Sequence, residues 1–251
     1  EFRRVLFRSP SETLDRSPRT FVLNLVFLQT IASPTFGSNA PLWSLAYEWW
    51  YYICFGAIVY AGTSLAERKF VRAAAATLCV VASVTVMHSD MLALAPIWMA
   101  GVAAHLCKTP RWPWSTAGAW LIFAAAALAS TLHQGLWGDY AVGLATAALV
   151  ICLKNKAPTG SRWERTGSAL AAFSYTLYAV HYPAFYFLQR LAGWDRTPFA
   201  GATEWSIFTL WCLGIATFCY GLSWLAERHT PAIRRALIRA LSRAGRPGDV
   251  R

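Results

Sequence analysis

Seven long apolar segments, separated by short polar loops, constrain the fold of this chain more than any other feature of its sequence. We place them at about 41–62, 70–88, 90–107, 116–132, 138–153, 169–190 and 205–226. Each is long enough, or nearly long enough, to cross a hydrocarbon core about 30 Å thick. Charged residues make up 14% of the 251 residues, against about 25% in typical soluble domains. The sequence therefore predicts an all-α fold, a polytopic integral membrane bundle with about seven transmembrane helices.

The N-terminal part of the chain differs from these segments. The apolar run from Phe21 to Ala32 is too short to span a membrane, and we expect it to be the end of a longer helix or a segment at the interface. The run Arg3–Ser9 resembles the translation of a sequencing-adapter oligonucleotide. We expect residues 1–20 to be an unstructured or artefactual segment, followed by a partial transmembrane domain at 21–227. The chain is then the C-terminal fragment of a longer protein.

Basic residues are unevenly distributed over the loops. Lysines and arginines follow the first, third, fifth and seventh segments, whereas the turns near 88–90 and 133–139 carry neither. By the positive-inside rule the basic loops and the C-terminus are cytoplasmic, and Ser33–Leu42 lies at the outer face. The net charge of +11 is then explained by membrane topology, and we predict no nucleic-acid partner.

Residues 228–251 contain seven arginines and one acid. Large aliphatic residues recur in this tail every four positions, with arginines on another face of the helix that this spacing predicts. These residues are Ile233, Leu237 and Leu241, and Arg235, Arg239 and Arg243. The pattern predicts a basic, cytoplasmic amphipathic helix suited to anionic lipid, with a frayed polar tail as the alternative.

An acid, Glu48, lies inside the first apolar segment, in the run WSLAYEWWYY at 43–52. An acid at that depth costs about 3 kcal/mol unless it is paired or hydrated, so it is usually retained for a function. On a helix, Ser44 and Glu48 share a face, which can present a carboxylate beside a hydroxyl to a polar cavity. The alternative is that Glu48 only pairs with a basic residue on another helix.

A second polar stripe is formed by Ser174, Tyr178 and His181, at positions i, i+4 and i+7 of the sixth segment. Pro183 has no N–H, so the carbonyl of Ala179 loses its helix partner. Within a membrane, a helix broken in this way persists only where it faces protein or a water-filled cavity. The stripe therefore predicts a lined pocket, with a helix–helix hydrogen bond of His181 as the alternative. No cysteine lies in a metal-ligand pattern, so all six are predicted to be free thiols and no metal site is predicted.

At these two stripes the chain resembles the membrane-bound acyltransferase-3 family of bacterial O-acyltransferases. Residues 43–52 resemble the family pattern Trp-Ser-Leu-x-x-Glu-x-x-Phe/Tyr-Tyr. Residues 174–183 resemble Ser-Tyr-x-x-Tyr-Leu-x-His-x-Pro, with Ala179 in place of the leucine. Glu227 matches the family's Glu-Arg-Pro ending only in part, because His229 and Thr230 precede Pro231.

The resemblance extends from about Phe21 to Pro231 and implies a protein of about ten spans, of which the first three are missing here. It implies a transferase of the bacterial inner membrane that moves an acyl group, often acetyl, from acyl-CoA to a hydroxyl. The acceptor would be a sugar, a cell-surface polysaccharide, a lipid or a macrolide. Acyl-CoA is a substrate in this reading, and no tightly bound cofactor is implied.

The resemblance also assigns roles to residues. Glu48 is the catalytic residue, orienting or stabilising a histidine base in the missing first span. The substrate-binding residues are Trp43, Ser44, Ser174, Tyr178 and His181. Expected partners are acyl-CoA, a carbohydrate or lipid-linked glycan acceptor, and membrane lipids. A transporter or flippase for a lipid-linked sugar is the main alternative, because intramembrane Glu and His also suit a transport path. A non-catalytic scaffold is a further alternative.

Overall fold

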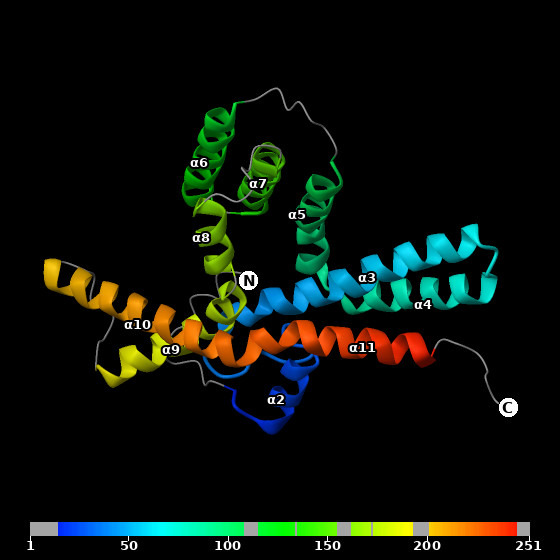
Figure 1. The fold of residues 1–251 in the computed structure, drawn as a ribbon, viewed down its shortest axis with the longest axis horizontal. Helices are drawn as coiled ribbons and strands as arrows, with labels where there is room; N and C mark the ends of the chain where they lie inside the picture. Colours follow the sequence, from blue (N-terminus) through cyan, green and yellow to red (C-terminus); the bar gives the residue numbers. More distant parts are fainter. Residues whose placement is uncertain are drawn as a thin grey trace. The chain divides into compact units, whose positions relative to one another are not determined.

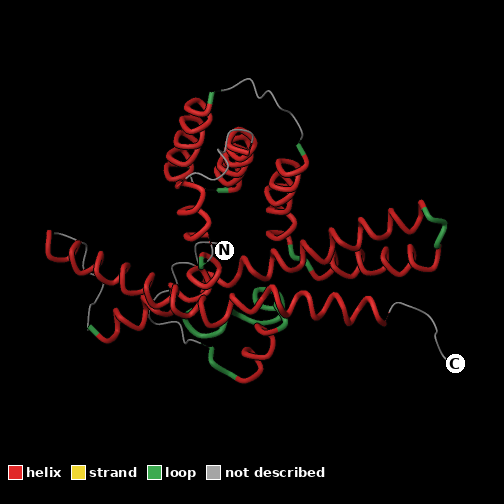
Figure 2. The backbone as a smooth tube through the Cα atoms, viewed as in Figure 1, coloured by secondary structure: helices red, strands yellow, loops and turns green. Residues whose placement is uncertain are grey.

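In the computed structural model the described residues are 15–107, 115–133, 135–154, 162–171, 173–192 and 201–244, and they are mostly helical (Figures 1 and 2). Within these ranges there is no strand, and Figure 2 accordingly shows helices and loops only. One isolated bridge joins Gln29 to Ser33. The predicted all-α class is confirmed for this part of the chain.

The chain divides into two compact units, and we describe each by itself. The α3 unit comprises Asp15–Thr35 and Leu42–Thr159, and the α9 unit contains Phe36–Pro41 and Gly160–Arg251. The short loop Phe36–Pro41 therefore belongs with the C-terminal helices, although the chain on both sides of it belongs to the α3 unit.

The α3 unit is built from one short helix and five long ones in its described part. These are α2 (Pro18–Leu25), α3 (Trp43–Ala66), α4 (Phe70–Val86), α5 (Ser89–Leu106), α6 (Thr116–Leu132) and α7 (Leu136–Lys154). A tight turn, with Arg68 in the left-handed region at φ 57°, makes α3 and α4 an antiparallel pair (Figure 1). Helix α7 packs against both α5 and α6.

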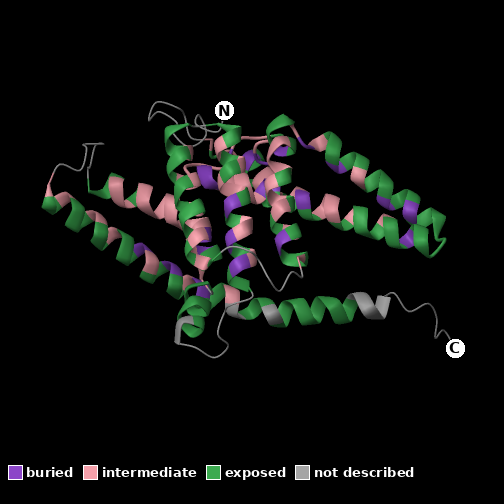
Figure 3. Ribbon diagram, turned by 90° about the horizontal axis from the view of Figure 1, so that it is seen from above, coloured by how far each residue is buried: buried purple, intermediate pink, exposed green. Residues whose placement is uncertain are grey.

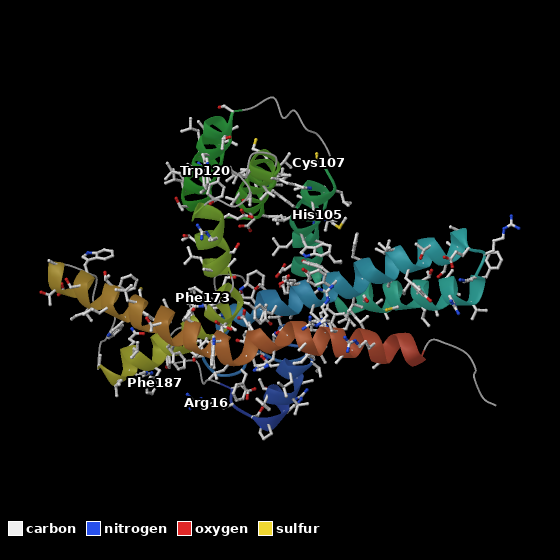
Figure 4. The ribbon with its side chains drawn as sticks, viewed as in Figure 1. Arg16, His105, Cys107, Trp120, Phe173 and Phe187 are labelled. Carbon is white, nitrogen blue, oxygen red and sulfur yellow. The ribbon has the colours of Figure 1, made fainter. Side chains whose placement is uncertain are left out.

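Small residues allow these helices to approach closely, as is usual in membrane bundles. The buried positions of α4 include Ala73, Ala76 and Ser83. At Gly143 of α7, an added Cβ would lie 2.6 Å from Cγ2 of Ile97 in α5. The ends of the same two helices are also joined, because the Lys154 ammonium donates to the backbone carbonyl of His105 (Figure 4). Basic side chains commonly bond the last carbonyls of a helix in this way.

The α9 unit contains α8 (Arg162–Ala171), α9 (Ser174–Leu191), α10 (Ala202–Ala226), the 3₁₀ turn η2 (Glu227–His229) and α11 (Thr230–Ala244). A further 3₁₀ turn, η1 (Ala40–Leu42), begins in its loop. Helices α9 and α10 pack along each other (Figure 1). The ring of Phe185 lies 5.9 Å from that of Phe208 and 5.7 Å from that of Trp211, both edge-on.

Each of the seven predicted segments contains a long helix, and most helix ends lie within three residues of the expected ones. In the described chain, α5, α7 and α10 are long and apolar enough to cross a membrane, and α4 and α6 are shorter apolar helices. Helices α3 and α9 are not among them. A chain with membrane-spanning helices is therefore supported, whereas seven spans remain a prediction.

Two predicted boundaries differ from the structure. The sixth segment does not begin as one helix at 169, because α8 ends at Ala171 and α9 begins at Ser174. At the N-terminus, Asp15–Thr20 of the segment predicted to be unstructured is in fact structured. The Ser17 hydroxyl caps α2, and Asp15 accepts hydrogen bonds from the Ser17 N–H at 2.8 Å and the Thr20 hydroxyl at 2.7 Å. These bonds lower the pKa of the Asp15 carboxyl. Residues 1–14 lie outside the described residues.

Candidate functional site

The first predicted group, Trp43, Ser44 and Glu48, lies in the first two turns of α3. The Glu48 side chain is exposed, Ser44 is half-buried, and the Trp43 ring packs edge-on against Tyr47 at 4.9 Å. One turn further on, the Tyr52 hydroxyl hydrogen-bonds the Glu48 carboxylate. No ion pair to Glu48 occurs among the described residues, so the alternative of a structural salt bridge finds no partner there.

The neighbouring face of α3 is its anchor to α5. Tyr47 and Tyr51 are buried, and the Tyr47 hydroxyl lies 3.2 Å from Nε2 of His88 in the turn before α5. The Tyr51 hydroxyl donates to the backbone carbonyl of Met91, which is fully buried. His88 is not among the site residues predicted from the sequence. The two buried tyrosines four residues apart could have indicated it, because each hydroxyl needs a polar partner.

A loop after α2 braces the start of α3 from another direction. The indole N–H of Trp50 donates to the carbonyl of Phe27 at 3.0 Å, and the Gln29 amide donates to the carbonyl of Leu42 at 3.0 Å. Phe27 and Thr30 both have left-handed backbone angles, with φ of 58° and 68°. The first turn of α3 is therefore held by side-chain hydrogen bonds as well as by apolar packing.

In the α9 unit, the helix continues through Pro183 to Leu191, so the predicted break does not occur. The predicted loss of the helix partner of the Ala179 carbonyl is confirmed, since this carbonyl takes its hydrogen bond from outside the helix. Nδ2 of Asn39 donates to it at 2.9 Å. The amide of Asn39 therefore replaces the backbone donor that Pro183 lacks, and α9 can pass the proline without ending.

The loop that carries Asn39 is fixed to α9 at a second point. The Tyr178 hydroxyl donates to the backbone carbonyl of Pro41, which is buried. Pro41 precedes Trp43 by two residues in the chain, so Tyr178 holds the loop that leads into the first polar stripe.

His181 is held by its own helix. Its Nδ1 lies 2.9 Å from the backbone carbonyls of both Leu177 and Tyr178. A carbonyl oxygen can only accept, so Nδ1 must carry the hydrogen. In the neutral ring Nε2 is then the unprotonated nitrogen, and in the described part of the chain no group bonds to it. The His181 side chain is half-buried, and its ring centroid is 6.0 Å from that of Tyr178.

Ser174 has a local role, because its hydroxyl donates to the carbonyl of Ala171 at 2.9 Å and so joins α8 to α9. Phe173, the residue before α9, provides no side-chain cap (Figure 4). The cap comes from Glu227 in η2, whose Oε1 accepts from the Thr176 N–H at 2.9 Å and from the Thr176 hydroxyl.

The predicted site residues thus fall into two groups. Trp43, Ser44 and Glu48 lie in the α3 unit, and Ser174, Tyr178 and His181 lie in the α9 unit. A single pocket lined by both groups remains a prediction. Within the described residues, no group of three or more His, Cys, Asp or Glu side chains is arranged to hold a metal ion. No protein-family model, curated protein or solved structure matches the chain.

Proposed function

We propose that this chain belongs to a membrane-bound O-acyltransferase that moves an acyl group, such as acetyl, from acyl-CoA to a hydroxyl. The acceptor class is a sugar, a cell-surface polysaccharide, a lipid or a macrolide. The observation that carries the proposal is the placement of His181, whose Nδ1 lies 2.9 Å from two backbone carbonyls and so leaves Nε2 as the ring nitrogen that can bind a hydroxyl group. The resemblance of residues 43–52 and 174–183 to the acyltransferase-3 patterns supports it independently.

In this proposal His181 binds the acceptor. A hydroxyl of the acceptor other than the reacting one donates to Nε2, and the two carbonyls that hold Nδ1 prevent the ring from turning over. An acceptor with a second hydroxyl besides the reacting one therefore fits this arrangement better than an isolated alcohol.

The chemical step moves the acyl group from the thioester sulfur to the acceptor oxygen. The acceptor oxygen attacks the thioester carbonyl, its proton passes to a base, the new C–O bond forms and the C–S bond breaks. The CoA thiolate leaves and is protonated. The base is the upstream histidine implied by the resemblance, and Glu48 stabilises its charged form. Glu48 suits this role because no cation pairs with its carboxylate among the described residues.

The first test is Glu48→Gln in membranes that contain the full-length protein. Loss of the negative charge at constant shape should lower acyl transfer from labelled acetyl-CoA by about 100-fold or more, as expected for a group that assists proton transfer. The matched control is Glu67→Gln, which removes an exposed acid paired with Lys69 in the turn after α3. Wild-type transfer rates in Glu48→Gln would reduce Glu48 to a structural role.

The second test addresses His181. Replacement by alanine removes the acceptor contact, so we expect the KM for the acceptor to rise at least tenfold, by about 1.4 kcal/mol or more, with the KM for acyl-CoA unchanged. His133→Ala, an exposed histidine after α6, is the control. An equal rise in both KM values would indicate a general structural defect and would contradict the assignment.

The transporter alternative is favoured less. Transport folds expose unwound backbone groups at broken helices to their substrates, whereas α9 is continuous and Asn39 occupies its freed carbonyl. The same assay separates the alternatives, since neither a flippase nor a scaffold would release CoA from acetyl-CoA when an acceptor is added.

A further inference from the structure

Helix α11 presents large apolar side chains that are exposed in the described part of the chain. Ile233 and Leu237 lie one turn apart on one face and are 64% and 58% exposed. From Ala232 to Ala240 every side chain is exposed (Figure 3). Helix α11 is 15 residues long, and η2 is the main element against which it packs. A helix of this kind is marginal in water without a surface to bind.

The charge of α11 indicates what that surface is. Arg234, Arg235 and Arg239 are all exposed, and no acid pairs with them in the described part of the chain. Helix α11 also starts directly after α10 and η2, and α10 is one of the helices apolar enough to cross a membrane. A basic amphipathic helix at the end of a span lies where it can insert its apolar face between lipids and bind their phosphates.

The junction η2 connects α11 to the helix that carries His181. Glu227 lies in this three-residue turn and caps the first turn of α9 through Thr176. A carboxylate is favourable at a helix N-terminus, where the backbone N–H groups are unpaired. Because α9 has no cap of its own at Phe173, the order of its first turn depends on where η2 is held.

We propose that η2 and α11 form an anionic-lipid sensor. Helix α11 binds the surface of an anionic phospholipid bilayer, and Glu227 transmits this anchoring to the first turn of α9, one turn before Tyr178 and His181. The proposal is independent of acyl transfer, since it concerns a lipid surface and the order of a helix end.

The test is amide hydrogen exchange of the full chain in single-copy nanodiscs. One set contains phosphatidylcholine alone, and the other contains phosphatidylcholine mixed with phosphatidylglycerol. With phosphatidylglycerol, the amides of 232–240 and of 174–177 should both exchange more slowly. Each arginine near an anionic surface favours binding by about fivefold, so Arg234→Gln/Arg235→Gln/Arg239→Gln should weaken docking by about 100-fold and abolish both effects.

Two variants separate the parts of the proposal. Arg16→Gln/Arg19→Gln removes exposed arginines at α2 and should leave the lipid response of α11 intact. Glu227→Ala should keep the protection of α11 but abolish the lipid response at 174–177. Exchange of α11 that is equal in both lipids, or that depends on the number of protein copies per disc, would overturn lipid binding. Protection of α11 without any change at 174–177 in the unsubstituted chain would overturn the coupling.

Discussion

Asn39 and Pro183 illustrate how single side chains complete the backbone of this protein. Proline removes one donor from α9, and the amide of Asn39 supplies another from a distant loop. At the start of α9 the Glu227 carboxylate accepts from the Thr176 N–H, and at the end of α5 the Lys154 ammonium donates to the carbonyl of His105. In each case an orphan backbone group receives a partner that the local sequence does not provide.

This interpretation predicts a coupling between Asn39 and Pro183. Asn39→Ala leaves the Ala179 carbonyl without its partner and should lower the free energy of unfolding by about 1–3 kcal/mol. In a Pro183→Ala background the restored N–H can bond that carbonyl, so the same change should cost much less. Thermal unfolding of the four variants in detergent measures the difference.

The control is Ser38→Ala, which alters the neighbouring residue of the same loop. It should show no coupling to Pro183→Ala. Equal costs of Asn39→Ala in both backgrounds would mean that Asn39 stabilises the loop and not the proline-containing turn.

Only part of this residue-scale picture could be predicted from the sequence. That the carbonyl of Ala179 has no partner within its own helix follows from the covalent structure of Pro183 alone. Its partner does not, because Asn39 is 140 residues away in the chain. The contact between Glu48 and Tyr52 is local, at a spacing of four residues, and is visible in the sequence. The cap that Glu227 provides for α9 joins residues 51 positions apart, so the sequence does not reveal it.

At the scale of the helices, apolar length predicted most boundaries because a span must be apolar along its whole extent. The prediction was wrong at the start of the sixth segment, where polar α8 and α9 are separate helices. The hydrogen bonds that define the start of α9 are made by Ser174, Thr176 and Glu227. The hydrophobicity of a segment does not depend on helix caps, so it does not reveal the break between α8 and α9.

Contact between α5 and α7 depends on Gly143, and this gives an element-scale prediction. Gly143→Ala places a methyl group against Ile97 and should lower the free energy of unfolding by about 1–3 kcal/mol through overpacking. Gly101→Ala, in the same bundle, meets nothing within 4 Å and should be neutral or slightly stabilising. Thermal unfolding compares the two. If Ile97→Ala does not relieve the effect of Gly143→Ala, the close approach is not its cause.

At the scale of the whole molecule, helical membrane character could be predicted from the sequence because it depends on composition and segment length. The division into two units could not. The loop Phe36–Pro41 belongs to the α9 unit through hydrogen bonds to Tyr178 and Ala179, and sequence proximity assigns it to α3 instead. For the same reason, whether the two polar stripes share one pocket could not be derived from their separate spacings.

Membrane topology is the prediction that belongs to this scale. Alkaline phosphatase is active only outside the cytoplasm, so fusions to the full-length protein after His88 and at Gly135 should be active. Fusions after Lys154 and at the C-terminus should be inactive, as the distribution of basic residues requires. A pattern that fails to alternate across α4 or α6, the shorter apolar helices, would show that the corresponding helix does not span.

The hydrogen bonds from Asn39 and Tyr178 also affect the order of assembly during synthesis. Their partners lie 140 and 137 residues apart in the chain. At typical translation rates the loop before α3 therefore waits on the order of ten seconds before α9 emerges. During that interval the entry to α3 has the hydrogen bonds made with Phe27 and Gln29 but not the two made with α9. A ribosome that stalls between α7 and α9 would release a membrane-inserted chain that contains α3 but lacks Tyr178 and Ala179, the partners of the loop before it.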